Sequence, residues 1–272
     1  MAPYFILKRM GCLDAILKAN EKIDDLQYKG LRLIQKTDGF RFGVDAVLLS
    51  NFAQMPRGGS VIDLGTGTGI IAVLLAAKKS PGRVVGLEIQ SEIAEMAARS
   101  VELNGLGEKV SIVQGDIRNA VGMFGASSFD AVASNPPYMT KGGGLLNPAD
   151  SKAISRHELL CTLADVVSTA GKLLRPGGKF SMVHRPQRLA DIICTMRENS
   201  IEPKLLRFVH PSPGKKPNLV LICGTKNGNP ELRVQEPLYV YDGSGSYSRE
   251  INEIYNRDSA GDQCMGPGNY EQ

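Results

Sequence analysis

From about residue 61 onward, segments typical of buried strands alternate with segments typical of helices, and this alternation constrains the fold more than any other feature. Alternation of this kind favours a mostly parallel sheet with helices on both faces. The predicted strands lie at 60–65, 83–90, 109–117, 129–135 and 179–184, and the predicted helices at 69–79, 92–105, 157–174 and 186–199. The sequence therefore predicts an α/β fold.

The segments on either side of the alternating part differ from it. We expect residues 1–58 to form an N-terminal extension of a helix, a hairpin with an Asp38-Gly39 turn and a second helix from about Asp45, covering the entrance of the main domain. Residues 59–227 hold the alternating units and end in an antiparallel hairpin across SPGKKP. The tail, 228–272, ends in a dozen residues without periodicity, which we expect to be frayed.

Composition excludes several classes of protein. With 42% hydrophobic and 22% charged residues the chain resembles an ordinary soluble protein, and its longest aliphatic run, at 70–77, is less than half of a membrane span. The five cysteines have no metal-ligand spacing, so we expect no metal site. Basic residues follow the first apolar patch, the reverse of a secretory signal, so we expect a cytoplasmic protein, and we expect a monomer.

A glycine-rich loop, DLGTGTGI, joins the first predicted strand to the first predicted helix. Gly65, Gly67 and Gly69 allow a tight turn and a close approach of the backbone to a ligand. A dinucleotide-binding GxGxxG loop would need glycine where Ile70 stands, and a triphosphate-binding loop would need a Gly-Lys pair, which this loop lacks. The loop therefore indicates a different nucleoside ligand.

Two acidic residues end the next two strands. Glu88 ends the second strand, where a carboxylate can accept both hydroxyls of a ribose, and Asp116 ends the third, where it can accept from an adenine amino group. Each carboxylate alone is more often a solvated residue at a strand end. Together with the glycine loop they converge on the crevice where open parallel sheets bind ligands.

This combination resembles the class I methyltransferases that use S-adenosyl-L-methionine, over about residues 60–225. The resemblance implies a Rossmann-like sheet of seven strands, the last of them antiparallel. It implies that Asp63 and the glycines face the amino-acid part of the cofactor, Glu88 the ribose, and Asp116 with Ile117 the adenine. The expected cofactor-binding residues are Asp63, Gly65, Thr66, Gly67, Gly69, Glu88, Ile89, Asp116, Ile117 and Asn135.

The fourth strand is followed by SNPPYM, residues 134–139, in which two prolines stand where a sheet gains nothing from them. The side-chain oxygen of Asn135 and the carbonyl of Pro136 can accept hydrogen bonds from an NH2 group and direct its lone pair toward a methyl donor. Pro137 stiffens the loop, and Tyr138 offers a flat face for stacking. A plain turn is the alternative. We expect the catalytic residues to be Asn135, Pro136, Pro137 and Tyr138.

NPPY is similar to the signature of two methyltransferase groups, those that modify the N6 amine of adenine and those that modify the glutamine amide of release factors. LRLIQKTDGFRFGVDAVLLSNF and LYVYDGSGSYSREINEIYN resemble segments of the bacterial tRNA(Val) (adenine-37-N6)-methyltransferase family. The resemblance implies an enzyme that methylates an adenine of tRNA. A glutamine methyltransferase and a noncatalytic cofactor- or RNA-binding module stay as alternatives.

Residues that contact an RNA substrate are expected in two basic clusters, within the first forty-one residues and around 204–216. Arg41, Phe42 and Asp45 have two equally weighted interpretations. They belong either to a packed hairpin and a helix cap or to the site itself. His157 and His184 are expected to be packed or surface residues. The expected substrate-binding residues are Arg41, Phe42, Lys141, Lys215 and Lys216.

Overall fold

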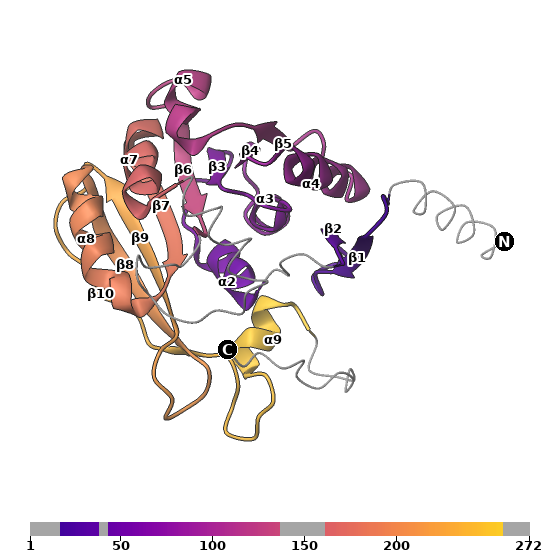
Figure 1. The fold of residues 1–272 in the computed structure, drawn as a ribbon. Coiled ribbons are helices and arrows are strands. Elements are labelled where there is room, and N and C mark those ends of the chain that lie inside the picture. Colours follow the sequence, from indigo (N-terminus) through magenta and orange to yellow (C-terminus); the bar gives the residue numbers. More distant parts are fainter. Residues whose placement is uncertain (1–16, 38–42, 137–160, 258–272) are drawn as a thin grey trace.

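The computed structural model describes residues 17–37, 43–136 and 161–257, and Figure 1 shows their arrangement. The strands in these residues are β1 (Glu21–Asp25), β2 (Arg32–Lys36), β3 (Ser60–Leu64), β4 (Arg83–Glu88), β5 (Val110–Gln114), β6 (Phe129–Ser134), β7 (Leu174–His184), β8 (Ile201–His210), β9 (Leu219–Lys226), β10 (Arg233–Val234) and β11 (Leu238–Tyr239). The helices are α2 (Val44–Phe52), α3 (Ile70–Lys78), α4 (Ser91–Leu103), η1 (Ile117–Asn119), α5 (Ala120–Phe124), α7 (Leu163–Leu173), η2 (Pro186–Arg188), α8 (Leu189–Glu198) and α9 (Arg249–Ile254).

The central sheet of the described residues has nine strands in the order β10-β8-β9-β7-β6-β3-β4-β5, with β11 also paired to β8. All neighbours pair in parallel except β9, which is antiparallel to both β7 and β8. The predicted Rossmann-like sheet of seven strands with one antiparallel strand is therefore confirmed for the seven longer strands. The two further strands come from the tail and pair with the free backbone groups of the edge strand β8.

Helices cover both faces of this sheet, and each face has its own hydrophobic core (Figure 1). On one face α2, α3 and α4 bury side chains such as Leu49, Leu74 and Val101. On the other face α7 and α8 contribute Val167 and Ile192. β3, β4 and β6, in the middle of the sheet, are buried along almost their whole length, as central parallel strands are.

In the N-terminal extension, the strand before the predicted Asp38-Gly39 turn pairs with an earlier strand of the chain. β2 pairs antiparallel with β1, an earlier strand that the sequence analysis did not predict. The predicted Asp38-Gly39 turn and the run after it lie outside the described residues. The predicted helix from about Asp45 is confirmed as α2, which begins at Val44.

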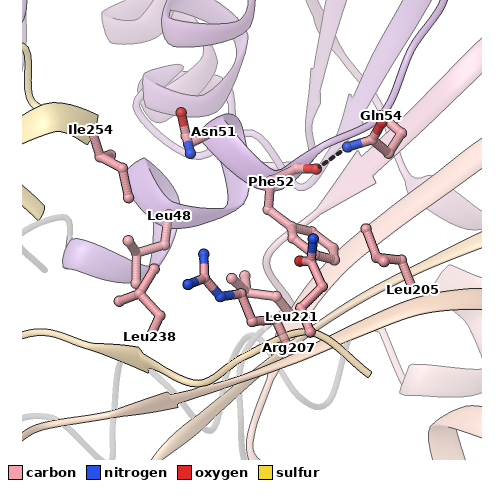
Figure 2. A pocket seen from close by; sticks show the side chains of 10 residues that line it. Leu48, Asn51, Phe52, Gln54, Leu205, Arg207, Leu221, Leu238 and Ile254 are labelled. Carbon is pink, nitrogen blue, oxygen red and sulfur yellow. Dashed lines mark hydrogen bonds between the residues drawn. The ribbon is translucent and has the colours of Figure 1, made fainter. Parts of the chain in front are cut away.

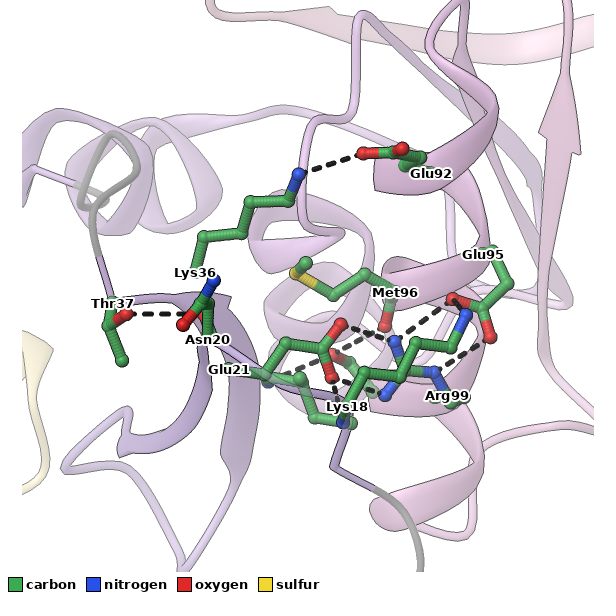
Figure 3. A network of polar contacts seen from close by, with 11 residues as sticks. Lys18, Asn20, Glu21, Lys36, Thr37, Glu92, Glu95, Met96 and Arg99 are labelled. Carbon is green, nitrogen blue, oxygen red and sulfur yellow. Dashed lines mark hydrogen bonds and ion pairs between the residues drawn. The ribbon is translucent and has the colours of Figure 1, made fainter.

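An ion-pair network joins this extension to α4 (Figure 3). The guanidinium of Arg99 donates to both carboxylate oxygens of Glu21 at 2.7 Å, and Lys36 pairs with Glu92 at 2.8 Å. Lys18 pairs with Glu95 at 2.9 Å. Lysines of the first basic cluster thus bind acidic groups of their own chain, because α4 presents a complementary acidic face to the hairpin.

The helix predicted at 157–174 begins later, at Leu163. The Thr162 hydroxyl accepts from the Asp165 N–H at 3.2 Å, and the Asp165 carboxylate accepts from the Thr162 N–H at 2.8 Å. This reciprocal capping satisfies backbone donors that a helix start leaves unpaired, so it sets the start at Leu163. Residues 157–160 lie outside the described part of the chain.

The tail packs against α2 and β8 through α9 (Figure 2). The Arg207 guanidinium donates to the two carboxylate oxygens of Glu250 at 2.5 and 2.7 Å. A cavity of about 160 Å³ lies between these elements, with Leu48, Leu238 and Ile254 among its lining residues. None of the helices in 17–37, 43–136 or 161–257 has the length and apolar character needed to cross a bilayer.

Candidate active site

The carboxyl ends of β3, β4, β5 and β6 meet at one edge of the sheet, because these four strands pair in parallel. The glycine loop leaves β3 at this edge, and Asn135 follows β6. The hydroxyl of Ser134 donates to the carbonyl of Leu64 at 2.8 Å, which joins the ends of β3 and β6. The residues predicted from four separate segments are therefore brought to one place.

The glycine loop has the backbone shape that its sequence predicts. Gly65, Gly67 and Gly69 all have positive φ, at 75°, 56° and 89°, a region that glycine enters without steric cost. A Cβ atom on Gly69 would lie 3.3 Å from the Cβ of Ala97, so this glycine also permits close packing of α3 on α4. Gly67 has open space around its α-carbon, which is where a ligand can approach.

Asp63 is fully buried beneath this loop. The Thr66 hydroxyl donates to its Oδ2 at 2.6 Å, while Oδ1 has no hydrogen-bond partner among the described residues. Desolvation raises the pKa of Asp63 from 3.8 to about 7, and the negative charge of Glu88 adds to this rise. A buried carboxylate with one unpaired oxygen suits a positively charged ligand group, such as the ammonium of the cofactor's amino-acid part.

Glu88 is also buried, at 4% exposure, and its carboxylate holds the loop to β4. Oε2 accepts from the Gly67 N–H at 3.0 Å, and Oε1 accepts from the Gln90 N–H at 3.0 Å. Oε1 also accepts from the side-chain amide of Gln90 at 3.3 Å. A carboxylate offers about four acceptor positions, so these three bonds leave room for a ribose hydroxyl. Ile89, beside it, is half-buried at the same strand end.

Asp116 stands at the end of β5 and caps η1. The Arg118 N–H donates to its Oδ1 at 2.9 Å and the guanidinium donates to its Oδ2 at 2.5 Å. These hydrogen bonds hold the pKa of Asp116 below its usual range. Ile117 is half-buried, and its Cδ1 lies 3.8 Å from the place of a Cβ on Gly65. Ile117 thus lies beside the glycine loop, while the place of the adenine stays a prediction.

Asn135 and Pro136 are the described half of the NPPY motif. Asn135 is half-buried and Pro136 is buried directly after β6. Nδ2 of Asn135 donates to Oδ2 of Asp45 at 3.1 Å, which joins the motif to the first turn of α2. Asp45, whose place in the site the sequence left open, therefore contacts the predicted catalytic side chain. The helix cap is Gly43 and not Asp45.

The predicted substrate-binding residues are described only in part. Lys215 and Lys216 are exposed in the turn between β8 and β9. Because β8 runs in the same direction as β6, this turn lies on the side of the sheet where the carboxyl ends of the parallel strands and the glycine loop lie. His184 is 2% exposed and packed, as predicted. The predicted residues that lie outside the described residues are Arg41, Phe42, Pro137, Tyr138, Lys141 and His157.

Comparisons with known proteins bear on this site. Residues 42–198 match the family described as methyltransferase small domain. A tRNA1(Val) (adenine(37)-N6)-methyltransferase of Porphyromonas gingivalis is 30% identical over 73% of this chain and 79% of its own length. The protein of the same name from Tolumonas auensis is 25% identical over 86% of this chain and 97% of its own.

Solved structures agree on the fold. A predicted O-methyltransferase from Agrobacterium tumefaciens superposes with a TM-score of 0.63 at 25% identity, covering 78% of this chain and 96% of that protein. Geranyl diphosphate methyltransferase, solved in complex with SAM, superposes with a TM-score of 0.51 at 16% identity, covering 66% of this chain and 84% of that one. The chain therefore belongs to the methyltransferase small domain family, together with the tRNA1(Val) (adenine(37)-N6)-methyltransferases.

Proposed function

We propose that this protein transfers a methyl group from S-adenosyl-L-methionine to the N6 amine of an adenine in tRNA, at position 37 of a valine tRNA. The single observation that carries the proposal is the placement of Asn135 at the carboxyl end of β6, beside the end of β3 where the glycine loop begins. The names and coverage of the relatives support the choice of substrate.

The chemistry explains why methylation of this amine needs hydrogen-bond acceptors and does not require a strong base. The lone pair of the N6 amine is delocalised into the purine ring, so this nitrogen is a poor nucleophile. Acceptors on its two hydrogens, the amide oxygen of Asn135 and the carbonyl of Pro136, favour a more tetrahedral nitrogen. The reaction forms an N–CH3 bond, breaks an S–CH3 bond and releases one N6 proton to water.

S-adenosyl-L-methionine, when bound, supplies a methyl group on a positively charged sulfur. The residues that would hold it are Asp63, the glycine loop, Glu88, Ile89, Asp116 with Ile117, and Asn135 at the end of β6. Asp63 and Glu88 are buried carboxylates with acceptor capacity, which fits a ligand that carries an ammonium group and ribose hydroxyls. Pro137 and Tyr138 complete this proposal as a stiff loop and a stacking face for the adenine ring.

Lys215 and Lys216 are proposed to contact the phosphates of the tRNA. They are exposed at the edge of the sheet that holds Asn135, so an RNA whose adenine enters the site passes near them. Arg41, Phe42 and Lys141 stay predictions for the same surface. We also propose that the protein is cytoplasmic and monomeric. Its domain boundaries are proposed to lie at 58/59 and 227/228.

Two other functions are distinguishable by experiment. A glutamine methyltransferase would use the same acceptors on an amide NH2, and a noncatalytic module would keep the cofactor site without turnover. Methyl transfer from labelled S-adenosylmethionine is measured with unmodified tRNA, release factor and adenine-containing duplex DNA. We expect label only in tRNA, as N6-methyladenosine after digestion, and label in release factor would contradict the proposal.

The control for this experiment is Asn135→Ala. This variant should lose turnover while its affinity for the cofactor stays within about a factor of ten, because the truncated group acts on the substrate amine. Turnover that survives in the variant would show that Asn135 does not act as proposed. Cofactor binding without transfer to any of the three substrates would favour the noncatalytic module.

A further inference from the structure

The first turn of α2 lies against the candidate catalytic asparagine. Asp45 and Asn135 are 90 residues apart in the chain, and Nδ2 of Asn135 donates to Oδ2 of Asp45 at 3.1 Å. Asp45 is 8% exposed and Asn135 is half-buried, so this contact is partly shielded from water. A shielded hydrogen bond to a carboxylate is stronger than one at the surface.

The chemistry of a carboxylate determines how the Asn135 amide is turned. A carboxylate only accepts hydrogen bonds, whereas an amide has an NH2 end that donates and an oxygen end that accepts. Asp45 must therefore face the NH2 end of Asn135, and the amide oxygen lies on the other branch, turned away from Asp45. Reversal of the amide would bring two acceptors together.

The carboxylate of Asp45 is itself held from two sides. Its Oδ1 accepts from the Ala46 N–H at 2.8 Å. On the neighbouring side Gly43 has no side chain, and a Cβ atom there would lie only 2.6 Å from Oδ1. The φ of Gly43 is −90°, which any residue adopts, so the need for glycine here comes from the space that the carboxylate occupies.

We propose that Asp45 is a positioning and specificity-determining residue that holds Asn135 as a hydrogen-bond acceptor toward the substrate base. This inference rests on the proposed function. An amide held in this way accepts from the exocyclic NH2 of adenine and repels the carbonyl that hypoxanthine carries at the same place. Asp45 thereby makes the site selective for a base that donates at position 6, without touching that base.

The test compares Asp45→Asn with the wild type on two unmodified valine tRNAs, one with adenosine and one with inosine at the target position. Binding is measured by fluorescence anisotropy with S-adenosylhomocysteine, so that no transfer occurs. The wild type should prefer the adenosine tRNA by roughly 10- to 100-fold, the range expected when a buried acceptor faces another acceptor. In Asp45→Asn the Asn135 amide can reverse, so this ratio should approach one, and kcat on the adenosine tRNA should fall about 10-fold or more.

A second variant keeps the test decisive if Asp45→Asn does not fold. Gly43→Ala leaves Asp45 in place and displaces its carboxylate, so it should lower both the binding ratio and kcat in the same direction. Cofactor affinity should stay within about threefold in both variants, because neither residue lies in the glycine loop.

The possible results separate this inference from the proposed function. In one result the wild type methylates the tRNA normally while every folded variant shows the same binding ratio and the same kcat as the wild type. That result would overturn the role of Asp45 and leave the proposed function standing. A wild type that neither binds nor methylates the tRNA would overturn the proposed function and this inference with it.

Discussion

The hydroxyl of Thr66 donates a 2.6 Å hydrogen bond to Oδ2 of Asp63 inside the core, beneath the glycine loop. This bond favours the charged carboxylate, but burial opposes it more strongly and raises the pKa of Asp63 to about 7. The folded protein therefore binds a proton at Asp63 that the unfolded chain, with an ordinary aspartate, has already lost above pH 4.

The first prediction follows from the sign of this shift. Asp63 contributes stability that is present below about pH 4 and is lost as the pH rises toward 7. Asp63→Asn imitates the neutral acid, so its free energy of unfolding should exceed that of the wild type by an amount that grows with pH, by roughly a few kcal/mol between pH 4 and 8. Urea unfolding of both proteins across this range measures the difference, and a difference independent of pH would contradict the assignment.

The second prediction concerns cofactor binding by the same residue. A cationic ligand group beside Asp63 favours its charged form, so binding below about pH 7 should release a proton. Calorimetric titration with S-adenosylmethionine in buffers of different ionisation enthalpy measures this release. We expect it in the wild type at pH 6 and not in Asp63→Asn. Equal proton release by both proteins would show that the released proton comes from a group other than Asp63.

The third prediction has the opposite sign and concerns His184. Burial lowers the pKa of His184 to about 4, so the folded protein resists protonation that the unfolded chain accepts near pH 6.5. Its contribution to stability is therefore lost as the pH falls from 6.5 to 4. In His184→Asn, which keeps an acceptor for the Arg185 N–H, stability should fall less steeply over this interval. Parallel urea-unfolding profiles for wild type and variant would contradict it.

The fourth prediction compares two glycines of the loop. Gly69→Ala should destabilise the protein by more than Gly67→Ala, because both positions have positive φ but only Gly69 has the Ala97 side chain 3.3 Å from the added methyl. The backbone penalty alone is about 1 kcal/mol, and crowding should add roughly 1 kcal/mol at Gly69. Denaturant unfolding without ligand measures both, and equal losses would show that Ala97 moves away freely.

The fifth prediction concerns the exposed turn between β8 and β9. Lys215→Ala and Lys216→Ala should each weaken tRNA binding and reduce the slope of log affinity against log salt by about one, because each lost phosphate contact releases about one counterion fewer. Lys109→Ala is the matched control, since Lys109 is exposed just before β5, at the opposite edge of the sheet. Binding isotherms measure these slopes between about 50 and 200 mM salt, the range over which phosphate contacts usually lose most of their affinity. An equal change of slope in Lys109→Ala would contradict the proposed phosphate contacts of Lys215 and Lys216.

Much of the fold follows from local patterns. The alternation of buried strands and helices predicted the sheet, and the positive φ of Gly65, Gly67 and Gly69 agrees with the loop expected between β3 and α3. These features depend on residues close together in the chain, where periodicity and backbone freedom act directly. The site residues at strand ends were predictable for the same reason, since parallel strands bring their carboxyl ends to one edge.

Other features needed the tertiary structure. β2 pairs with β1, and lysines of the first basic cluster pair with α4, because the acidic face of that helix lies against the hairpin. The pKa of Asp63 depends on burial by segments far away in the chain, and the contact between Asp45 and Asn135 joins residues that only folding brings together. The sequence by itself determined the elements, the glycine loop and the acceptor motif, because these are local. The tertiary structure decided which charges are neutralised, how deeply the Asp63 carboxylate is buried and which way the Asn135 amide is turned, since each depends on desolvation and contacts between distant segments.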